Sequence, residues 1–243
     1  MLSTTKIEKC PNCSSENIVK NGFTKGKNQR VLCKDCGKSR VLHKKYALNL
    51  SFEQIQRSFL ERLSLCGVSR IFSMSYYQVY KMLNLSFVSM PDFKTWALEK
   101  PKADDVLEFD ELCGFCGKKK NKQWIWAALS RHTRQVVAYV IGDRSEKTFK
   151  RLLRKIPIEW LKRQSYSDAW KSYALLLSKR NHSIIGKETG ETNHIERFWA
   201  TLRARISRYV RKSLSFSRKL RYHHLITKLF ILDYNVQRLS TLF

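Results

Sequence analysis

Acidic residues are scarce in this 243-residue sequence, which holds 20 Asp and Glu against 47 Lys and Arg and has a formal net charge of +27. The excess is spread along the chain, since residues 1–100 hold 17 basic and 7 acidic side chains and the remainder holds 30 and 13. A charge of this size favours a polyanionic partner bound through phosphate contacts, and nucleic acid is the partner that it indicates. A solvated surface and a face for anionic membranes are the alternatives, but no lipidation motif supports the second.

Long apolar runs are also missing. No stretch approaches the roughly 20 apolar residues of a membrane-spanning helix, and residues 1–6 lack the apolar segment that a secretory signal requires. We therefore expect no membrane partner and a soluble, cytoplasmic protein associated with the nucleoid. In that compartment its seven cysteines would stay reduced or bind metal.

Proline is rare, and two of the four prolines, Pro91 and Pro101, lie in a segment that we predict to be a linker over residues 89–102. Before it, residues 1–45 are rich in lysine and short of aliphatic side chains, whereas residues 46–88 carry apolar residues at helical spacing. After it, residues 103–243 alternate strand-like and helix-like runs, which predicts an α/β domain with a mixed sheet.

The expected elements of this last domain follow from its periodicity and its helix caps. They are strands over 106–110, 124–130 and 135–141, a helix over 145–155 that begins after Ser145 and ends before Pro157, a strand over 165–167, and helices over 169–178 and 191–209.

Four cysteines form two Cys-x-x-Cys pairs, Cys10 with Cys13 and Cys33 with Cys36, and 19 residues separate the pairs. The spacing is typical of one tetrahedral Zn²⁺ held by four thiolates, and Gly37 suits the tight turn after the second pair. So small a segment cannot bury enough apolar surface to fold alone, so we predict a zinc-binding ribbon over residues 1–45 with one structural Zn²⁺. Two disulfides or unlinked thiols are the alternative.

The other three cysteines do not extend this pattern. Cys113 and Cys116 form a lone pair after the first predicted strand of residues 103–243, and we expect ordinary thiols there. Cys66 is predicted to be a small core residue of a helix.

Residues 46–88 predict a helix-turn-helix that binds DNA. A first helix is expected from an N-cap at Ser51 to about Leu63, a second over 65–72, a turn over 73–75 and a recognition helix over 76–83. The predicted core consists of Val68, Ile71, Val79 and Leu83. The side chains left to face the DNA are Tyr76, Tyr77, Gln78 and Lys81. A plain helical hairpin docked on the following domain is the alternative.

Three acidic side chains occupy separate predicted elements. Asp110 ends a strand, Asp168 follows a second strand and Glu196 lies in the last predicted helix. Mg²⁺ prefers carboxylate oxygens together with phosphate, and two such ions can activate the attacking oxygen and stabilise the leaving oxygen of a phosphodiester. We therefore predict that these acids are the catalytic residues and bind two Mg²⁺ ions in an enzyme that cuts and joins DNA.

Two acids close to Asp110 in the sequence are Glu108 and Glu111, and one of them competes with it for this role. Glu108 shares a strand face with Asp110 and is a rival ligand, whereas Glu111 is expected to point the other way.

The predicted helix over 191–209 brings further groups to the carboxylates. Asn193 and Arg203 share a face with Glu196 and are predicted to hold DNA beside the metals. Residues 197–228 carry ten basic and no acidic side chains, so Arg211 and Lys212 are predicted to belong to a phosphate-binding track. A solvated helix is the alternative.

Several of these segments occur together in one known family. They are the two cysteine pairs, the predicted helix-turn-helix, Phe109-Asp110-Glu111-Leu112, Ser167-Asp168-Ala169-Trp170, and the run from Ile195-Glu196-Arg197 to Arg211-Lys212-Ser213-Leu214-Ser215-Phe216-Ser217. They resemble the insertion-sequence-one transposases of prokaryotes over nearly the whole chain. The resemblance implies an RNase H-like catalytic domain with an Asp-Asp-Glu triad and Mg²⁺, and N-terminal modules that bind inverted-repeat ends. Cys113 and Cys116 depart from the family pattern.

From these observations we expect a DNA transposase that binds the inverted-repeat ends of its own element. It would cleave DNA to free a 3′-hydroxyl and transfer that hydroxyl to target DNA. Because two ends must be held together, a homo-oligomer is expected. The alternatives are a zinc and helix-turn-helix transcription regulator with an inactive C-terminal domain, and an RNase H-like nuclease that cuts without joining.

Overall fold

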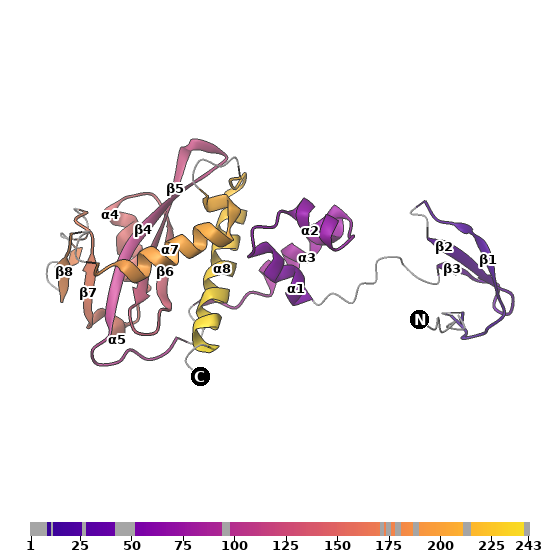
Figure 1. Ribbon diagram of the computed structural model, residues 1–243, viewed down its shortest axis with the longest axis horizontal. Coiled ribbons are helices and arrows are strands. Elements are labelled where there is room, and N and C mark those ends of the chain that lie inside the picture. The colour runs from indigo at the N-terminus through magenta and orange to yellow at the C-terminus, as the bar shows by residue number, and fades with distance from the viewer. Residues whose placement is uncertain are drawn as a thin grey trace.

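A computed structural model describes residues 9–10, 12–25, 28–41, 52–93, 98–170, 173, 176–177, 181–186, 190–210 and 215–240 (Figure 1). Three parts follow one another along the chain: a small antiparallel sheet, a group of three helices, and a larger sheet covered by helices. Within the described residues, no helix combines the length and the apolar character that crossing a bilayer would need.

The small sheet has the order β1 (Ile18–Phe23), β2 (Gln29–Cys33) and β3 (Ser39–Val41), and both pairings are antiparallel. Its only described aliphatic side chain that is fully buried is Val31. An apolar core of this size cannot stabilise a fold without a cross-link or a metal.

Three helices follow: α1 (Phe52–Phe59), α2 (Leu65–Ile71) and α3 (Tyr76–Val88). The hydroxyl of Ser64 caps α2, and Ser75 with Gln78 forms a reciprocal capping box on α3. The first helix ends at Phe59 and not near Leu63, because Arg62 adopts a positive φ of 62° and turns the chain. The predicted N-cap Ser51 lies outside the described residues.

Two expectations for these helices are wrong. Ile71 was assigned to the core but is 58% exposed, because α2 ends there and the next residue, Phe72, packs inward in its place. Cys66 is exposed, because it occupies the second position of α2 on the face turned to solvent. Val68, Val79 and Leu83 are buried as predicted.

The three helices share one hydrophobic core with the helices of the larger part. Arg205 joins the two parts: its carbonyl accepts from the N–H of Arg62 at 2.8 Å, and its guanidinium binds Glu61 at 2.8 Å and Asp233 at 3.0 Å. The helical group is therefore docked on the larger part, which leaves one face of α3 available to a partner.

The larger sheet has five strands in the order β6-β5-β4-β7-β8. They are β4 (Val106–Cys116), β5 (Lys118–Ser130), β6 (Val136–Gly142), β7 (Gln164–Ser167) and β8 (His182–Ile184). The first three pair antiparallel, whereas β7 runs parallel to β4 and β8 parallel to β7. The mixed α/β architecture that we predicted is confirmed, and this order fits an RNase H-like domain.

Helices cover both faces of this sheet (Figure 1). Phe109 and Trp126 pack toward α4 (Glu146–Leu153) and α5 (Ile158–Leu161), while Leu112 and Ile125 pack toward α7 (Asn193–Arg205) and α8 (Leu220–Ser240). Ser145 caps α4 as expected. With both faces buried, the strands are apolar on both sides, and polar side chains within them stand out as exceptions.

Several elements differ from expectation. The strands β4 and β5 extend beyond the predicted ranges 106–110 and 124–130, so Cys113 and Cys116 lie within β4 and not after it, and the short helix α5 was not predicted. The predicted helix over 191–209 is two elements, because Ile206 takes an extended conformation between α7 and the 3-10 helix η3 (Ser207–Tyr209). The strand β8 and the helix α8 were not predicted. In α8 the consecutive residues Leu229–Leu232 are all buried, so the helix lacks the one-sided pattern that reveals a helix in a sequence. Half of the predicted helix over 169–178 lies outside the described residues.

Candidate active site

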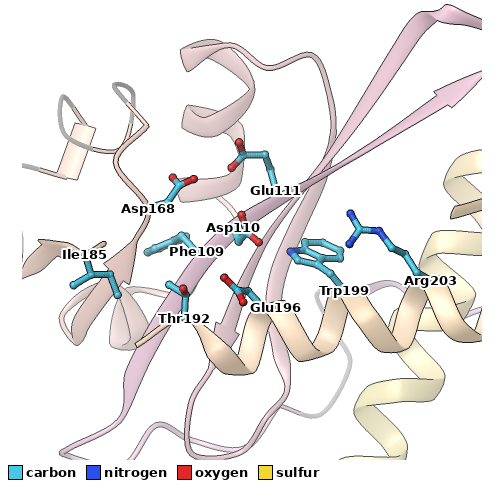
Figure 2. A pocket seen from close by; sticks show the side chains of 9 residues that line it. All are labelled: Phe109, Asp110, Glu111, Asp168, Ile185, Thr192, Glu196, Trp199 and Arg203. Atoms are coloured by element: carbon cyan, nitrogen blue, oxygen red, sulfur yellow. The ribbon is translucent and has the colours of Figure 1, made fainter. Parts of the chain in front are cut away.

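A cavity of about 400 Å³ opens where β4, β7 and α7 meet (Figure 2). Three of its lining residues are the acids Asp110, Asp168 and Glu196, which come from three different elements. The complete lining is Phe109, Asp110, Glu111, Asp168, Ile185, Thr192, Glu196, Trp199 and Arg203.

Strand pairing explains how two of these acids meet. Glu108 of β4 lies opposite Tyr166 of β7 in the parallel register, so continuing both strands by two residues brings Asp110 beside Asp168. Asp168 directly follows β7, where its carboxylate accepts from the N–H of Trp170 at 3.2 Å. Glu196 lies in the first turn of α7 and reaches the same space from the helix (Figure 2).

Glu108, the rival to Asp110, does not line the cavity. Its side chain is fully buried, and its carboxylate accepts from the N–H groups of His194 at 3.1 Å and Ile195 at 3.0 Å and from Nε of Arg131 at 2.9 Å. A carboxylate at this position satisfies the free N–H groups of the helix start and opposes the positive end of the helix dipole. Glu108 therefore anchors α7, and with it Glu196.

Glu111 belongs to the cavity lining although it occupies the opposite strand face from Asp110. Its carboxylate accepts from the hydroxyl of Tyr173 at 2.8 Å and from Nε of Arg144 at 2.8 Å. The guanidinium of Arg144 lies 4.7 Å from the ring centre of Trp124 and 5.5 Å from that of Trp170. Alternation predicted the direction of Glu111 but not that a fourth carboxylate, neutralised by an arginine, would border the cavity.

The carboxylates raise one another's cost of ionisation. Burial, followed by the nearby charges of Glu111, Asp168 and Glu196, raises the pKa of Asp110 from 3.8 to about 7. An oxygen-lined cavity in which burial and neighbouring carboxylates keep an acid protonated to about pH 7 fits a hard divalent cation.

The raised pKa of Asp110 gives a prediction for stability. Between about pH 4 and pH 7 the folded state binds a proton that the unfolded state has lost, so stability falls as the pH rises through this window. In magnesium-free buffer that retains zinc, Asp110→Asn should raise the Tm by several degrees at pH 8, and this gain should shrink toward pH 5. A Tm equal to or below that of the native protein at pH 8 would contradict the assignment of Asp110 as a desolvated acid.

Two other cavity residues lie on α7 beside Glu196. Arg203 lines the cavity, as its helical spacing from Glu196 predicted, whereas Asn193 is exposed and is not part of the lining. Trp199 is 3% exposed, and within the described chain no acceptor pairs with its indole N–H, which faces the carboxylates in Figure 2. Our reading of the sequence missed Trp199, although its spacing of three residues from Glu196 was a usable signal. DNA contacts by Asn193, Arg211 and Lys212 stay predictions, and the last two residues lie outside the described part of the chain.

The four N-terminal cysteines form a second site. Their sulfurs all lie within 4.8 Å of one another, with 3.8 Å between Cys10 and Cys36 and 3.6 Å between Cys13 and Cys33. A disulfide needs about 2.05 Å, whereas sulfurs at the corners of a tetrahedron with Zn–S bonds near 2.3 Å stand about 3.8 Å apart. Backbone N–H groups, first that of Asn12, lower the pKa of Cys10 to about 7, which favours the thiolate that a metal binds. The donor set and geometry fit one Zn²⁺.

The side chains assigned to DNA contact on α3 are accessible. Tyr76 and Tyr77 are 53% and 71% exposed, and Gln78 and Lys81 are also exposed. The amide oxygen of Gln78 already accepts from Ser75 in the capping box, so only its amide nitrogen remains to donate to a base edge. Recognition of DNA by α3 stays a prediction.

Known proteins match a large part of this chain. Residues 106–236 match the family model described as IS1 transposase. The insertion element iso-IS1n protein InsB of Shigella dysenteriae is 36% identical over 126 residues, which cover 52% of this chain and 93% of that protein. The insertion element IS1 protein InsB of Shigella flexneri is 36% identical over 120 residues, covering 48% and 86%. The insertion element IS1 4 protein InsB of Escherichia coli K12 is 33% identical over 130 residues, covering 51% and 73%. The family match includes the three cavity carboxylates and leaves residues 1–105 outside it.

Proposed function

This chain belongs to the IS1 transposase family, and we propose that it cleaves DNA at the ends of its own element and joins the freed 3′-hydroxyl to target DNA. One observation carries the proposal: three acids far apart in the sequence line one cavity of a five-stranded mixed α/β fold. Family membership implies that the protein acts on DNA, and the net charge of +27 suits that partner.

We assign the metal ligands to Asp110, Asp168 and Glu196, which would hold two Mg²⁺ ions. Such ions supply Lewis-acid stabilisation of the charge on the attacking and leaving oxygens of a phosphodiester. The carboxyl group of Asp110, which keeps a proton to about pH 7 without added positive charge, would give up that proton when cations enter the cavity.

Other side chains of the chain would position the substrate. Glu108 and Arg131 fix the start of α7, so the carboxylate of Glu196 enters the cavity from a rigid element. On the same helix, the indole N–H of Trp199 and the guanidinium of Arg203 are donors at the cavity wall, suited to the non-bridging oxygens of the scissile phosphate.

The N-terminal half would recognise the element ends. The four-cysteine ribbon and the helix-turn-helix over residues 46–88 would bind the inverted repeats, with Tyr76, Tyr77, Gln78 and Lys81 of α3 toward the DNA. Because two ends must be brought together, the working form would be a homo-oligomer. The proposal includes the predicted domain boundaries: the zinc ribbon over residues 1–45, the helix-turn-helix over 46–88, the linker over 89–102 and the catalytic domain over 103–243.

An assay of Mg²⁺-dependent cleavage and strand transfer on DNA that carries the native ends tests this proposal. We expect both activities, with free 3′-hydroxyls as the first product. Binding without cleavage would identify a transcription regulator, and cleavage without joining would identify a nuclease.

Arg203 gives a sharper test of substrate positioning. Replacing Arg203 with alanine should slow cleavage at saturating protein by roughly tenfold to a hundredfold, because a misplaced scissile phosphate costs rate even at full occupancy. It should also flatten the salt dependence of binding by about one counterion. Arg197→Ala is the matched control, since Arg197 is exposed on the same helix but does not line the cavity. Full activity of Arg203→Ala, together with an unchanged salt dependence of DNA binding, would show that Arg203 does not position the scissile phosphate.

A further inference from the structure

A second cavity, of about 380 Å³, lies between α3 and the start of α8, away from the carboxylates. Its charged lining consists of Arg208 of η3 with Arg218 and Lys219, which directly precede α8. No Asp or Glu is among the described residues that line it. A further cavity of about 290 Å³ shares Arg208 and Tyr76 with it, so Arg208 stands where the two meet.

The guanidinium of Arg208 lacks a counter-ion within the part of the chain that the structure describes. The side chain is partly buried, and its Nη1 donates a long hydrogen bond of 3.4 Å to the hydroxyl of Ser217. Burial lowers the pKa of Arg208 below its ordinary value, but an arginine remains charged at physiological pH. A cation withdrawn from water without a partner costs free energy, and an anion in the cavity would offset that cost.

Three tyrosines, two from α3 and one from α8, also line this cavity. The rings of Tyr76 and Tyr80 are stacked, with centres 6.5 Å apart and an angle of 6° between them, and the hydroxyl of Tyr80 lies 2.8 Å from that of Tyr222. The hydroxyl of Tyr222 also donates to Oδ1 of Asn84 at 3.3 Å, so the hydroxyls of Tyr80 and Tyr222 are already paired. A groove that combines cations with aromatic rings is typical of nucleic-acid binding.

We propose that this cavity is a DNA-backbone site, the phosphate cleft, in which Arg208, Arg218 and Lys219 bind phosphates and Tyr76, Tyr80 and Tyr222 form the wall. Among anions, DNA is favoured over an acidic segment of a second copy, because the chain holds only 20 acidic residues against 47 basic ones. The proposal rests on the proposed function only in taking DNA as the ligand.

The position of the cleft gives it a defined role. Tyr76 and Tyr80 belong to α3, whereas Arg208 and Lys219 flank the helices that pack on the catalytic sheet. Because the helical group and that sheet share one core, DNA bound in the cleft would keep a fixed placement relative to the carboxylates. Contacts to the backbone set register and affinity without reading sequence.

Binding of labelled duplex DNA to the full-length, zinc-loaded protein tests the cleft. Two duplexes of equal length are compared, one with an element end and one of scrambled sequence. The double variant Arg218→Gln with Lys219→Gln changes two exposed side chains at the rim, so the fold should survive. We expect the negative slope of log affinity against log salt concentration to become shallower by about two. We also expect the affinity at 0.15 M salt to decrease on the order of tenfold for both duplexes. Arg208→Gln should weaken binding in the same sequence-independent way.

The matched control is Lys147→Gln with Lys150→Gln, which removes two exposed charges from α4 on the other side of the sheet. This pair should leave the salt slope unchanged. An unchanged slope in the rim variant, or an equal loss in the control pair, would overturn the proposal. So would a rim variant that loses oligomers but keeps DNA affinity, because the cleft would then bind protein. The readout is binding alone, so failure of the cleft stays distinct from failure of the proposed cleavage, which the cleavage assays detect.

Discussion

Replacing Asp168 with asparagine should abolish DNA cleavage while leaving DNA binding unchanged. The substitution keeps the size of the side chain and its position after β7 but removes one of the three carboxylates that we assign to metal binding. Losing a ligand charge should cost several kcal/mol of transition-state stabilisation, so we expect cleavage to fall by roughly a thousandfold or more. Single-turnover cleavage at saturating protein and Mg²⁺ measures this loss apart from binding.

Asp104→Asn is the matched control for this variant. Asp104 is an exposed acid just before β4 and lies outside the cavity, so its loss should not affect cleavage. Nicking by Asp168→Asn at a rate near that of the native protein would disprove the assignment of the three carboxylates. A parallel loss of DNA affinity would instead show that the substitution disturbs the fold.

Removing zinc should unfold the N-terminal ribbon and leave the helices and the larger sheet folded. The four thiolates hold a three-stranded sheet whose described residues bury few aliphatic side chains. Structural Zn²⁺ in comparable small modules contributes about 10–16 kcal/mol of apparent binding free energy at pH 7, so the ribbon should have no stable apo state. On addition of a chelator, the amide resonances of residues 12–41 should move to the chemical shifts of an unfolded chain. One zinc per chain should be lost, and with it the preference of the protein for element ends.

Cys33→Ser should reproduce this result without a chelator, and Cys66→Ser should not. Cys66 is an exposed thiol of α2, apart from the four-cysteine cluster, and therefore controls for the loss of a cysteine. Less than one tightly bound zinc in fresh, reduced native protein would rule out the metal site. A ribbon that stays folded in Cys33→Ser would show that the metal is dispensable for its stability.

Features that depend on neighbours in the chain were predicted well. The two Cys-x-x-Cys pairs, the cap at Ser145 and the alternation along β4 each follow from a few adjacent residues. The family resemblance came from the same kind of local motif, and the family match confirms it. Ligand pairs, helix caps and strand alternation can be predicted from the sequence, because bond geometry and hydrogen bonding limit each of them to a few conformations.

Features that depend on contacts between distant segments were not predictable in this way. Alternation places Glu108 and Asp110 on one face of β4, yet Glu108 anchors α7 and Asp110 borders the cavity. The difference arises because the N–H groups at the start of α7 bind the carboxylate of Glu108. Burial of Trp199 and the break at Ile206 likewise depend on what packs against α7. The helix α8 was missed because neighbours surround it and remove its one-sided pattern.

The sequence was therefore sufficient for the family and the class of fold, since these depend on residue types at fixed spacings. Which acids share the cavity, which described arginines lack a counter-ion and how the helical group docks depend on contacts between segments far apart in the chain, such as the backbone hydrogen bond from Arg62 to Arg205. Such contacts form only when the whole chain is packed, because the burial and charge of each group are set by all the elements around it.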